Sequence, residues 1–134
     1  MNIATIDKQA INAGEDVVRV RQAVRAKAIA LGFSLVDQTR IITAASEIAR
    51  NTLDYGGGGE VVIDVLTSGI RKGLRLVFSD KGPGIADISR ALEDGYTSGN
   101  GMGLGLSGAK RLVNEFDIKS SPGQGTTVTL VRWK

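Results

Sequence analysis

The chain has 134 residues, about the length of one domain, and an apolar fraction of 42%, which is ordinary for a globular protein. It contains no cysteine and no histidine, which excludes disulfides, thiolate and imidazole metal sites, histidine-dependent triads and histidine phosphorylation. The net charge is +3, and three Phe, two Tyr and one Trp are too few to favour nucleic-acid binding by stacking. No apolar run approaches the roughly 20 residues of a membrane-spanning helix, so we expect a cytoplasmic protein without membrane or nucleic-acid partners.

The first half of the chain predicts one strand and two long helices. Ile3–Asn12 is the strand, and Asn12 with Glu15 marks the start of a helix that continues to about Leu31, where Gly32 is a C-cap. Ser34 begins a second helix that continues to about Tyr55 and stops at Gly56–Gly59. Apolar residues recur at helical spacing in both helices: Val17, Val20, Val24, Ala28 and Leu31 in the first, and Ile41, Ala44, Ala45, Ile48 and Thr52 in the second.

The second half predicts two hairpins separated by a short helix, a glycine-rich loop and a third long helix. The strands are expected at Glu60–Thr67, Leu74–Ser79, Phe116–Ser121 and Thr126–Trp133, and the helix at Leu104–Glu115. Hairpins without βαβαβ alternation favour a two-layer α/β sandwich of the α+β kind. We expect one domain, residues 1–134, in which helices cover one face of a mixed, mostly antiparallel sheet.

An aspartate follows the core strand that ends at Ser79. Asp80 is succeeded by Lys81-Gly82-Pro83-Gly84, and Asp, Gly and Pro are all common in simple turns. The functional alternative is a carboxylate that accepts a hydrogen bond from an exocyclic amino group, as on adenine.

Glu47 and Asn51 lie one turn apart on the second predicted helix. A solvated polar helix face is the usual outcome of this pattern. If the helix lines a pocket instead, Asn51 offers an oxygen ligand to Mg²⁺, and Glu47 is placed to orient or deprotonate an attacking hydroxyl.

Two glycine-rich segments remain. Gly101-Met102-Gly103-Leu104-Gly105 precedes the third helix and is either a flexible surface loop or a lid whose N–H groups face phosphates. It is not a Walker loop, because no G-K-[ST] follows, and it lacks the βαβ frame of a dinucleotide site. Gly123-Gln124-Gly125-Thr126-Thr127 is a hairpin turn that also offers a threonine hydroxyl.

The order of these motifs is more specific than any one of them. S-E-I-A-R-N (46–51), D-K-G-P-G-I (80–85), G-N-G-M-G-L-G-L (99–106) and G-Q-G-T-T (123–127) together resemble the GHKL ATPase superfamily. The resemblance implies the Bergerat α/β sandwich and ATP with Mg²⁺ as cofactors. It implies Glu47 as catalytic base and Asn51 as metal ligand. The implied nucleotide-binding residues are Asn51, Asp80, Gly82, Gly84, Ile85, Gly99, Gly101, Met102, Gly103, Leu104, Gly105, Thr126 and Thr127.

Within this superfamily the chain looks most like the switch and anti-sigma-factor kinases of bacterial partner switching. The runs at 31–51, 80–85, 93–99 and 105–116 are similar to those of the stressosome serine/threonine kinase. The resemblance implies phosphorylation of STAS-domain scaffold and antagonist proteins, and a downstream effector such as a protein phosphatase. Two alternatives stay open: an anti-sigma-factor kinase that sequesters a sigma factor, and a nucleotide-gated binding module with little catalysis.

Overall fold

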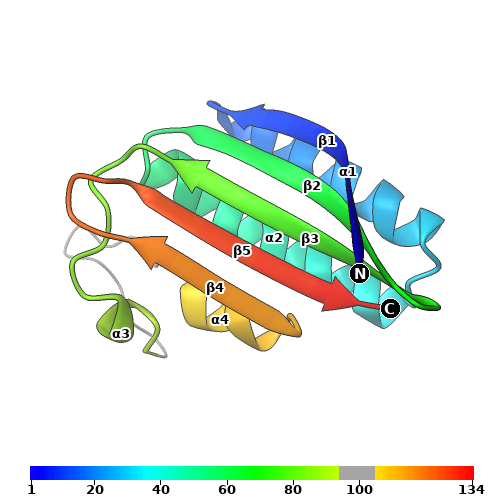
Figure 1. Ribbon diagram of the computed structural model, residues 1–134. Helices are drawn as coiled ribbons and strands as arrows, with labels where there is room; N and C mark the ends of the chain where they lie inside the picture. The colour runs from blue at the N-terminus through cyan, green and yellow to red at the C-terminus, as the bar shows by residue number, and fades with distance from the viewer. Residues whose placement is uncertain (94–104) are drawn as a thin grey trace.

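The computed structural model describes residues 1–93 and 105–134, which form a five-stranded sheet with helices against one face (Figure 1). The strands are β1 (Asn2–Ile11), β2 (Gly59–Ser68), β3 (Arg71–Asp80), β4 (Glu115–Ser120) and β5 (Thr126–Trp133). Their order is β1-β2-β3-β5-β4, and every neighbouring pair is antiparallel. The two-layer α+β prediction is confirmed, but the sheet is not mixed. Hairpins join β2 to β3 and β4 to β5, so no parallel crossover arises in the described chain.

Two long helices cover the sheet, α1 (Gly14–Ala30) and α2 (Leu35–Asp54), and α2 crosses behind β3 and β5 (Figure 1). Two short helices, α3 (Ile88–Ala91) and α4 (Leu106–Arg111), lie between β3 and β4 in the sequence. The predicted third long helix, Leu104–Glu115, is therefore wrong in length. The observed helix, α4, begins after Gly105, contains the poor helix former Gly108 and ends at its C-cap, Leu112. Two residues later the chain already pairs with β5, because the backbone N–H of Asn114 donates to the carbonyl oxygen of Val131 at 2.9 Å.

The ends of α1 show how local sequence sets its limits. Ala13 is the N-cap, and the carboxylate of Asp16 accepts hydrogen bonds from the backbone N–H of Asn12 (2.9 Å) and of Ala13 (3.1 Å). The N-cap and its carboxylate partner are thus Ala13 and Asp16, each one residue later than the predicted Asn12 and Glu15. At the other end the C-cap is Leu31, one residue before the predicted Gly32. Gly32 follows it with a φ of +84°, a conformation that favours glycine after a helix.

The core lies between the helices and the sheet. The predicted apolar stripes of α1 and α2 are buried there, with Leu31 partly so. They pack against alternate residues of the strands, among them Ile63, Leu76, Phe78 and Leu130. Apolar residues that recur about every 3.6 positions on the helices and every 2 on the strands therefore meet in one apolar layer, as the sequence predicts.

On the other face of the sheet, which no helix of residues 1–93 and 105–134 covers (Figure 1), the centre is polar. Asp64, which is 2% exposed, forms an ion pair with Arg75 at 2.8 Å and accepts a hydrogen bond from Thr5 Oγ1 at 2.6 Å. These partners satisfy a charge that would otherwise be expensive to bury. In the described part of the chain, no helix combines the length and apolar character that crossing a bilayer requires.

Candidate functional site

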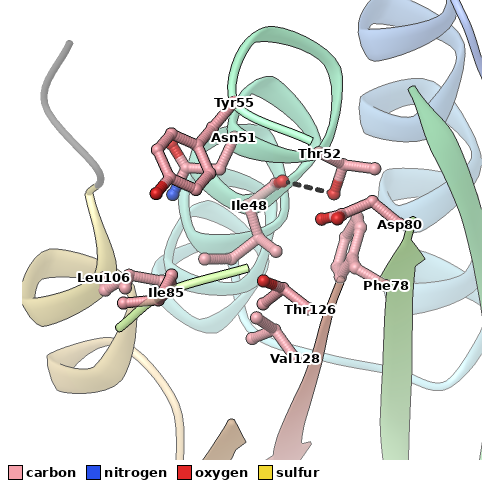
Figure 2. A pocket seen from close by; sticks show the side chains of 10 residues that line it. All are labelled: Ile48, Asn51, Thr52, Tyr55, Phe78, Asp80, Ile85, Leu106, Thr126 and Val128. Atoms are coloured by element: carbon pink, nitrogen blue, oxygen red, sulfur yellow. Dashed lines mark hydrogen bonds between the residues drawn. The ribbon is translucent and has the colours of Figure 1, made fainter. Parts of the chain in front are cut away.

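A small cavity lies between α2 and one end of the sheet, and Figure 2 shows the side chains around it. Helix α2 and the strands β3 and β5 supply two walls, and the segment after β3 and helix α4 close the remainder. The lining residues are Ile48, Asn51, Thr52, Tyr55, Phe78, Asp80, Ile85, Leu106, Thr126 and Val128. Asp80 and Asn51, which the sequence placed in one site, therefore line a single cavity.

Asp80 is the last residue of β3 and pairs with Thr126 at the first position of β5. Its Oδ1 accepts a hydrogen bond from the backbone N–H of Gly82 at 2.9 Å. Burial raises the pKa of Asp80, and the hydrogen bonds from the backbone N–H groups of Gly82 and Thr126 partly oppose that shift. A half-buried carboxylate with no cationic partner among the described residues is poised to accept hydrogen bonds from a ligand.

Close backbone packing holds this carboxylate in place. A side-chain carbon added to Gly56 would overlap the Asp80 carboxyl group, and one added to Gly82 would come within 2.7 Å of the Cα of Gly56. The turn after α2 and the turn after β3 can approach this closely because both positions are glycine. The glycine-rich 56–59 segment therefore positions Asp80 as well as ending α2.

Tyr55 joins the helix wall to the segment after β3. It is the C-cap residue of α2, lines the cavity and donates a hydrogen bond from its hydroxyl to the carbonyl oxygen of Gly84 at 3.0 Å. Ser120 Oγ accepts from the N–H of Ile85 at 2.7 Å and lies 2.8 Å from Thr126 Oγ1. These bonds fix residues 84 and 85 between the helix and the sheet.

Asn51 and Glu47 face different surroundings on α2. The amide nitrogen of Asn51 is buried and has no hydrogen-bond partner, which is unusual for a buried polar group and is common where a ligand belongs. Glu47 is exposed, and its carboxylate lies so close to Gly105 that an added side-chain carbon there would overlap it. Gly105, the N-cap residue of α4, and Glu47 are thus neighbours.

The other predicted site residues divide into four groups. Ile85 and Thr126 line the cavity, whereas Gly82, Gly84 and Gly105 shape its surroundings through backbone contacts. Thr127 points to the opposite face of β5, because side chains alternate along a strand, and lines a separate hollow beside Lys119. Gly99, Gly101, Met102, Gly103 and Leu104 lie outside the described residues.

Sequence reasoning missed the apolar walls. Ile48 and Leu106 were expected only as helix residues, Phe78 and Val128 only as strand residues, and Tyr55 only as the end of a helix, yet all five line the cavity. A signal for Tyr55 exists, since it follows Asn51 by four residues and so shares its helix face.

The cavity measures about 20 Å³, which holds about one water, so a nucleotide base enters only when the walls separate.

Comparison with known proteins identifies the family. Residues 36–134 match the family described as histidine kinase-, DNA gyrase B- and HSP90-like ATPases. The chain is 45% identical over 118 residues to the serine/threonine-protein kinase RsbT of Bacillus subtilis (strain 168), covering 88% of this chain and 89% of that protein. It is 28% identical over 119 residues to the anti-sigma F factor of Thermoanaerobacter sp. (strain X514), covering 84% and 82%.

A solved structure agrees on the fold. The RsbU and RsbW domains of a Mycobacterium tuberculosis protein superpose with a TM-score of 0.63 at 21% identity, over 96% of this chain and 33% of that one. This chain therefore spans about a third of that structure, and the likeness concerns the fold alone. Together the motifs, the cavity and the match over residues 36–134 show that the chain belongs to the histidine kinase-, DNA gyrase B- and HSP90-like ATPase (GHKL) family.

Proposed function

We propose that this chain is an ATP-dependent protein serine/threonine kinase of a bacterial partner-switching pathway, working in the cytoplasm as a single domain. The observation that carries the proposal is the cavity that Asp80 and Asn51 line from opposite walls. The 45% identity to RsbT supports the choice of a serine or threonine hydroxyl as the phosphate acceptor.

Asp80 recognises the nucleotide base. An ionised carboxylate only accepts hydrogen bonds, so it selects a base that presents an amino group at that point, as adenine does. Phe78, Val128 and Ile48 supply apolar surface for the ring, and Tyr55 and Leu106 stand at its sides. Because the cavity is narrow, binding of the ring requires its α4 side and α2 to separate.

Asn51 would hold Mg²⁺ together with the nucleotide phosphates. Magnesium prefers oxygen ligands, retains several waters and takes few ligands from a protein. The side chain fits such a site: its amide oxygen is a ligand of the kind Mg²⁺ takes, and its amide nitrogen, which has no hydrogen-bond partner, can donate to a phosphate oxygen. The described residues contain no group of three or more carboxylates that would form a separate cage. When bound, the ion neutralises charge on the phosphates. Gly99, Gly101, Met102, Gly103, Leu104 and Gly105 would complete the phosphate side of the site.

Glu47 acts as the general base. It lies one turn before Asn51 and is exposed, so a hydroxyl of another protein can reach it. The hydroxyl oxygen forms a bond to the γ-phosphorus as its proton passes to Glu47, and the bond from that phosphorus to the β,γ-bridging oxygen breaks to release ADP. The acceptors are STAS-domain scaffold and antagonist proteins, and partner exchange releases an effector such as a protein phosphatase.

A second candidate is an anti-sigma factor that holds a sigma factor. The 28% identity to an anti-sigma F factor favours it, although the relationship is more distant than that to RsbT. A gated binding module with slow chemistry is compatible with either. Direct, nucleotide-dependent binding of a purified sigma factor would select this candidate over the kinase of STAS proteins.

Transfer of labelled phosphate from ATP to a purified STAS-domain protein tests the proposal. We expect Glu47→Gln to lower the transfer rate by roughly 10²–10⁴-fold while the affinity for ATP changes little. Asp54→Asn is the matched control, because Asp54 is an exposed carboxylate on the same helix paired to Arg50 at 3.6 Å. Undiminished transfer by Glu47→Gln would show that Glu47 is not the general base. A lack of transfer by the unaltered chain would show that it is not a kinase of this protein class.

A further inference from the structure

Exposed apolar side chains are concentrated at one end of the molecule. Eight large apolar side chains are exposed in the described residues, and six of them belong to the start of β1, the last turn of α1, the start of α2 and the β2–β3 turn. These parts lie at the end that carries both termini, and the cavity-forming turns lie at the other end (Figure 1). The six are Met1, Ile3, Ile29, Leu35, Val36 and Ile70.

Contacts of the C-terminal residue join two of these regions, the β2–β3 turn and the α1–α2 connection, into one surface. The backbone N–H of Lys134 donates to the carbonyl oxygen of Lys72 at 2.8 Å, which ties the end of β5 to the β2–β3 turn. The Lys134 ammonium lies beside Gly32, where an added side-chain carbon would be 3.0 Å from it, which ties the same strand to the α1–α2 connection. We call the resulting area the distal surface, made of Ile29, Leu35, Val36, Ile70, Lys72 and Lys134.

Folding does not explain the apolar residues of the distal surface. Leu35 and Val36 are 77% and 59% exposed at the first two positions of α2, where Ser34 already provides the cap. Ile70 is 99% exposed in a two-residue turn between the paired Ser68 and Arg71, a position where polar residues are usual. Three large apolar side chains therefore stand in water at places where polar ones would serve the fold as well.

The charge at this end is strongly one-sided. Residues 27–40, 66–74 and 131–134 contain one anion, Asp37, and six cations, Lys27, Arg40, Arg71, Lys72, Arg132 and Lys134. A second anion at this end, Glu115, already accepts a hydrogen bond from Trp133 Nε1 at 3.0 Å. Asp37 is already bound to Arg132 at 2.6 Å. In residues 1–93 and 105–134, Lys72 and Lys134 form no ion pair, so their charge is available to a partner.

We propose that the distal surface docks an acidic, amphipathic segment of a partner protein. The apolar side chains of that segment pack on Ile70 and Leu35, and its carboxylates pair with Lys72 and Lys134. Because the surface lies at the far end from the cavity, this partner can stay bound while another protein reaches the nucleotide. The proposal does not depend on the identity of the phosphate acceptor.

A lipid bilayer fits the same surface less well. Helices that lie on membranes present one continuous apolar face with aromatic anchors. Here the apolar residues come from two helices and a turn, and the nearby Trp133 ring is covered by the Arg71 guanidinium at 4.6 Å from its centre. The shape and charge of the surface therefore favour a protein segment.

Site-specific photo-crosslinking tests this proposal. A benzophenone amino acid replaces Ile70 in the full chain, which is then irradiated in living cells of its own host, and the adducts are mapped by mass spectrometry. The control position is Ile6, which is apolar and 38% exposed but lies outside the distal surface. We expect adducts at position 70 well above those at position 6, on a protein segment with more carboxylates than amines and with apolar residues beside them.

A charge change gives the second measurement. Lys72→Glu combined with Lys134→Glu should lower the yield of that adduct at least roughly fivefold and leave the melting temperature nearly unchanged, since both ammonium groups are exposed. Adducts no more abundant at position 70 than at position 6, adducts on a basic segment or on lipid, or an unchanged yield in the double variant would each overturn the proposal. Cosedimentation with vesicles of mixed anionic phospholipid would likewise assign the surface to membranes instead.

Discussion

The backbone of Gly56 lies directly against the carboxyl group of Asp80. Gly56 follows the C-cap of α2, and Asp80 ends β3, so the contact joins the helix layer to the sheet at the mouth of the cavity. A hydrogen atom in place of a side chain on Gly56 leaves room for the carboxylate, and a methyl group would not. The position of the proposed adenine-binding group thus depends on a residue that has no functional atoms of its own.

Gly56→Ala should displace Asp80 and weaken ATP binding by at least about tenfold, with a loss of stability on the order of 1–3 kcal/mol from overpacking. The matched control is Gly57→Ala. Gly57 has a φ of +75° but no atom near its missing side chain, so alanine there strains the backbone without touching Asp80. Calorimetric titration with ATP should separate the two variants. Equal losses of affinity in both would show that the contact with Asp80 is unimportant.

Asp80→Asn should stabilise the protein at neutral pH. A carboxyl group whose pKa is raised in the folded state disfavours the ionised folded protein, so folding stability falls as pH rises above the ordinary value of 3.8. Asparagine removes this penalty, and we expect a melting temperature higher by roughly 2–4 °C at pH 7, with the gain disappearing below about pH 4. A gain that persists unchanged in acid would point to packing rather than to the charge.

Tyr55→Phe should loosen the segment after β3. The substitution removes only the hydroxyl that donates to Gly84 O and keeps the ring in the cavity wall. We expect a loss of about 0.5–1.5 kcal/mol in the free energy of unfolding, measured by urea titration, and weaker nucleotide binding. If both quantities match those of the unaltered chain, the bond to Gly84 has no role in the site.

Asp37 and Arg132 should make stability depend on pH in acid. The hydrogen bond from Arg132, at 2.6 Å, lowers the pKa of Asp37, and Arg132 also donates to Leu112 O at 3.3 Å at the end of α4. A lowered folded pKa gives stability that is present above 3.8 and is lost as pH falls through the folded value.

Asp37→Asn should therefore lower the melting temperature at pH 7, by roughly 3–6 °C, and make little difference in strong acid. Arg40→Gln is the control, because Arg40 lies 3.9 Å from Asp37 and is half-exposed, so its removal should change little. A temperature difference between Asp37→Asn and the unaltered chain that is the same at every pH would contradict the electrostatic origin.

Periodic patterns predicted most of the fold because they report burial directly. The apolar stripes of α1 and α2 and the alternation in β2, β3 and β5 follow from which side of each element faces the core. The length of α4 did not follow, because pairing of β4 with β5 competes with helix continuation beyond Leu112, and local propensity does not contain that competition.

Polar site residues at unusual positions could be predicted from the sequence, whereas the apolar residues that line the cavity could not. A carboxylate at a strand end and an asparagine in mid-helix stand out in a sequence, and Asp80 and Asn51 do line one cavity. Phe78, Val128 and Ile48 do not stand out, because a wall of a pocket and a piece of the core carry the same residues. The separation of Thr126 from Thr127 required the register of β5 against β3.

Calorimetric titration of the purified chain with ATP and with GTP, in Mg²⁺, tests most directly whether Asp80 selects adenine in this cavity. We predict saturable heat with ATP, affinity for GTP lower by at least roughly tenfold, and affinity for ATP in Asp80→Asn lower by a similar factor, as expected for the loss of a hydrogen bond to a charged group. Equal affinity for the two nucleotides, or an Asp80→Asn variant that binds ATP as the unaltered chain does, would contradict the account.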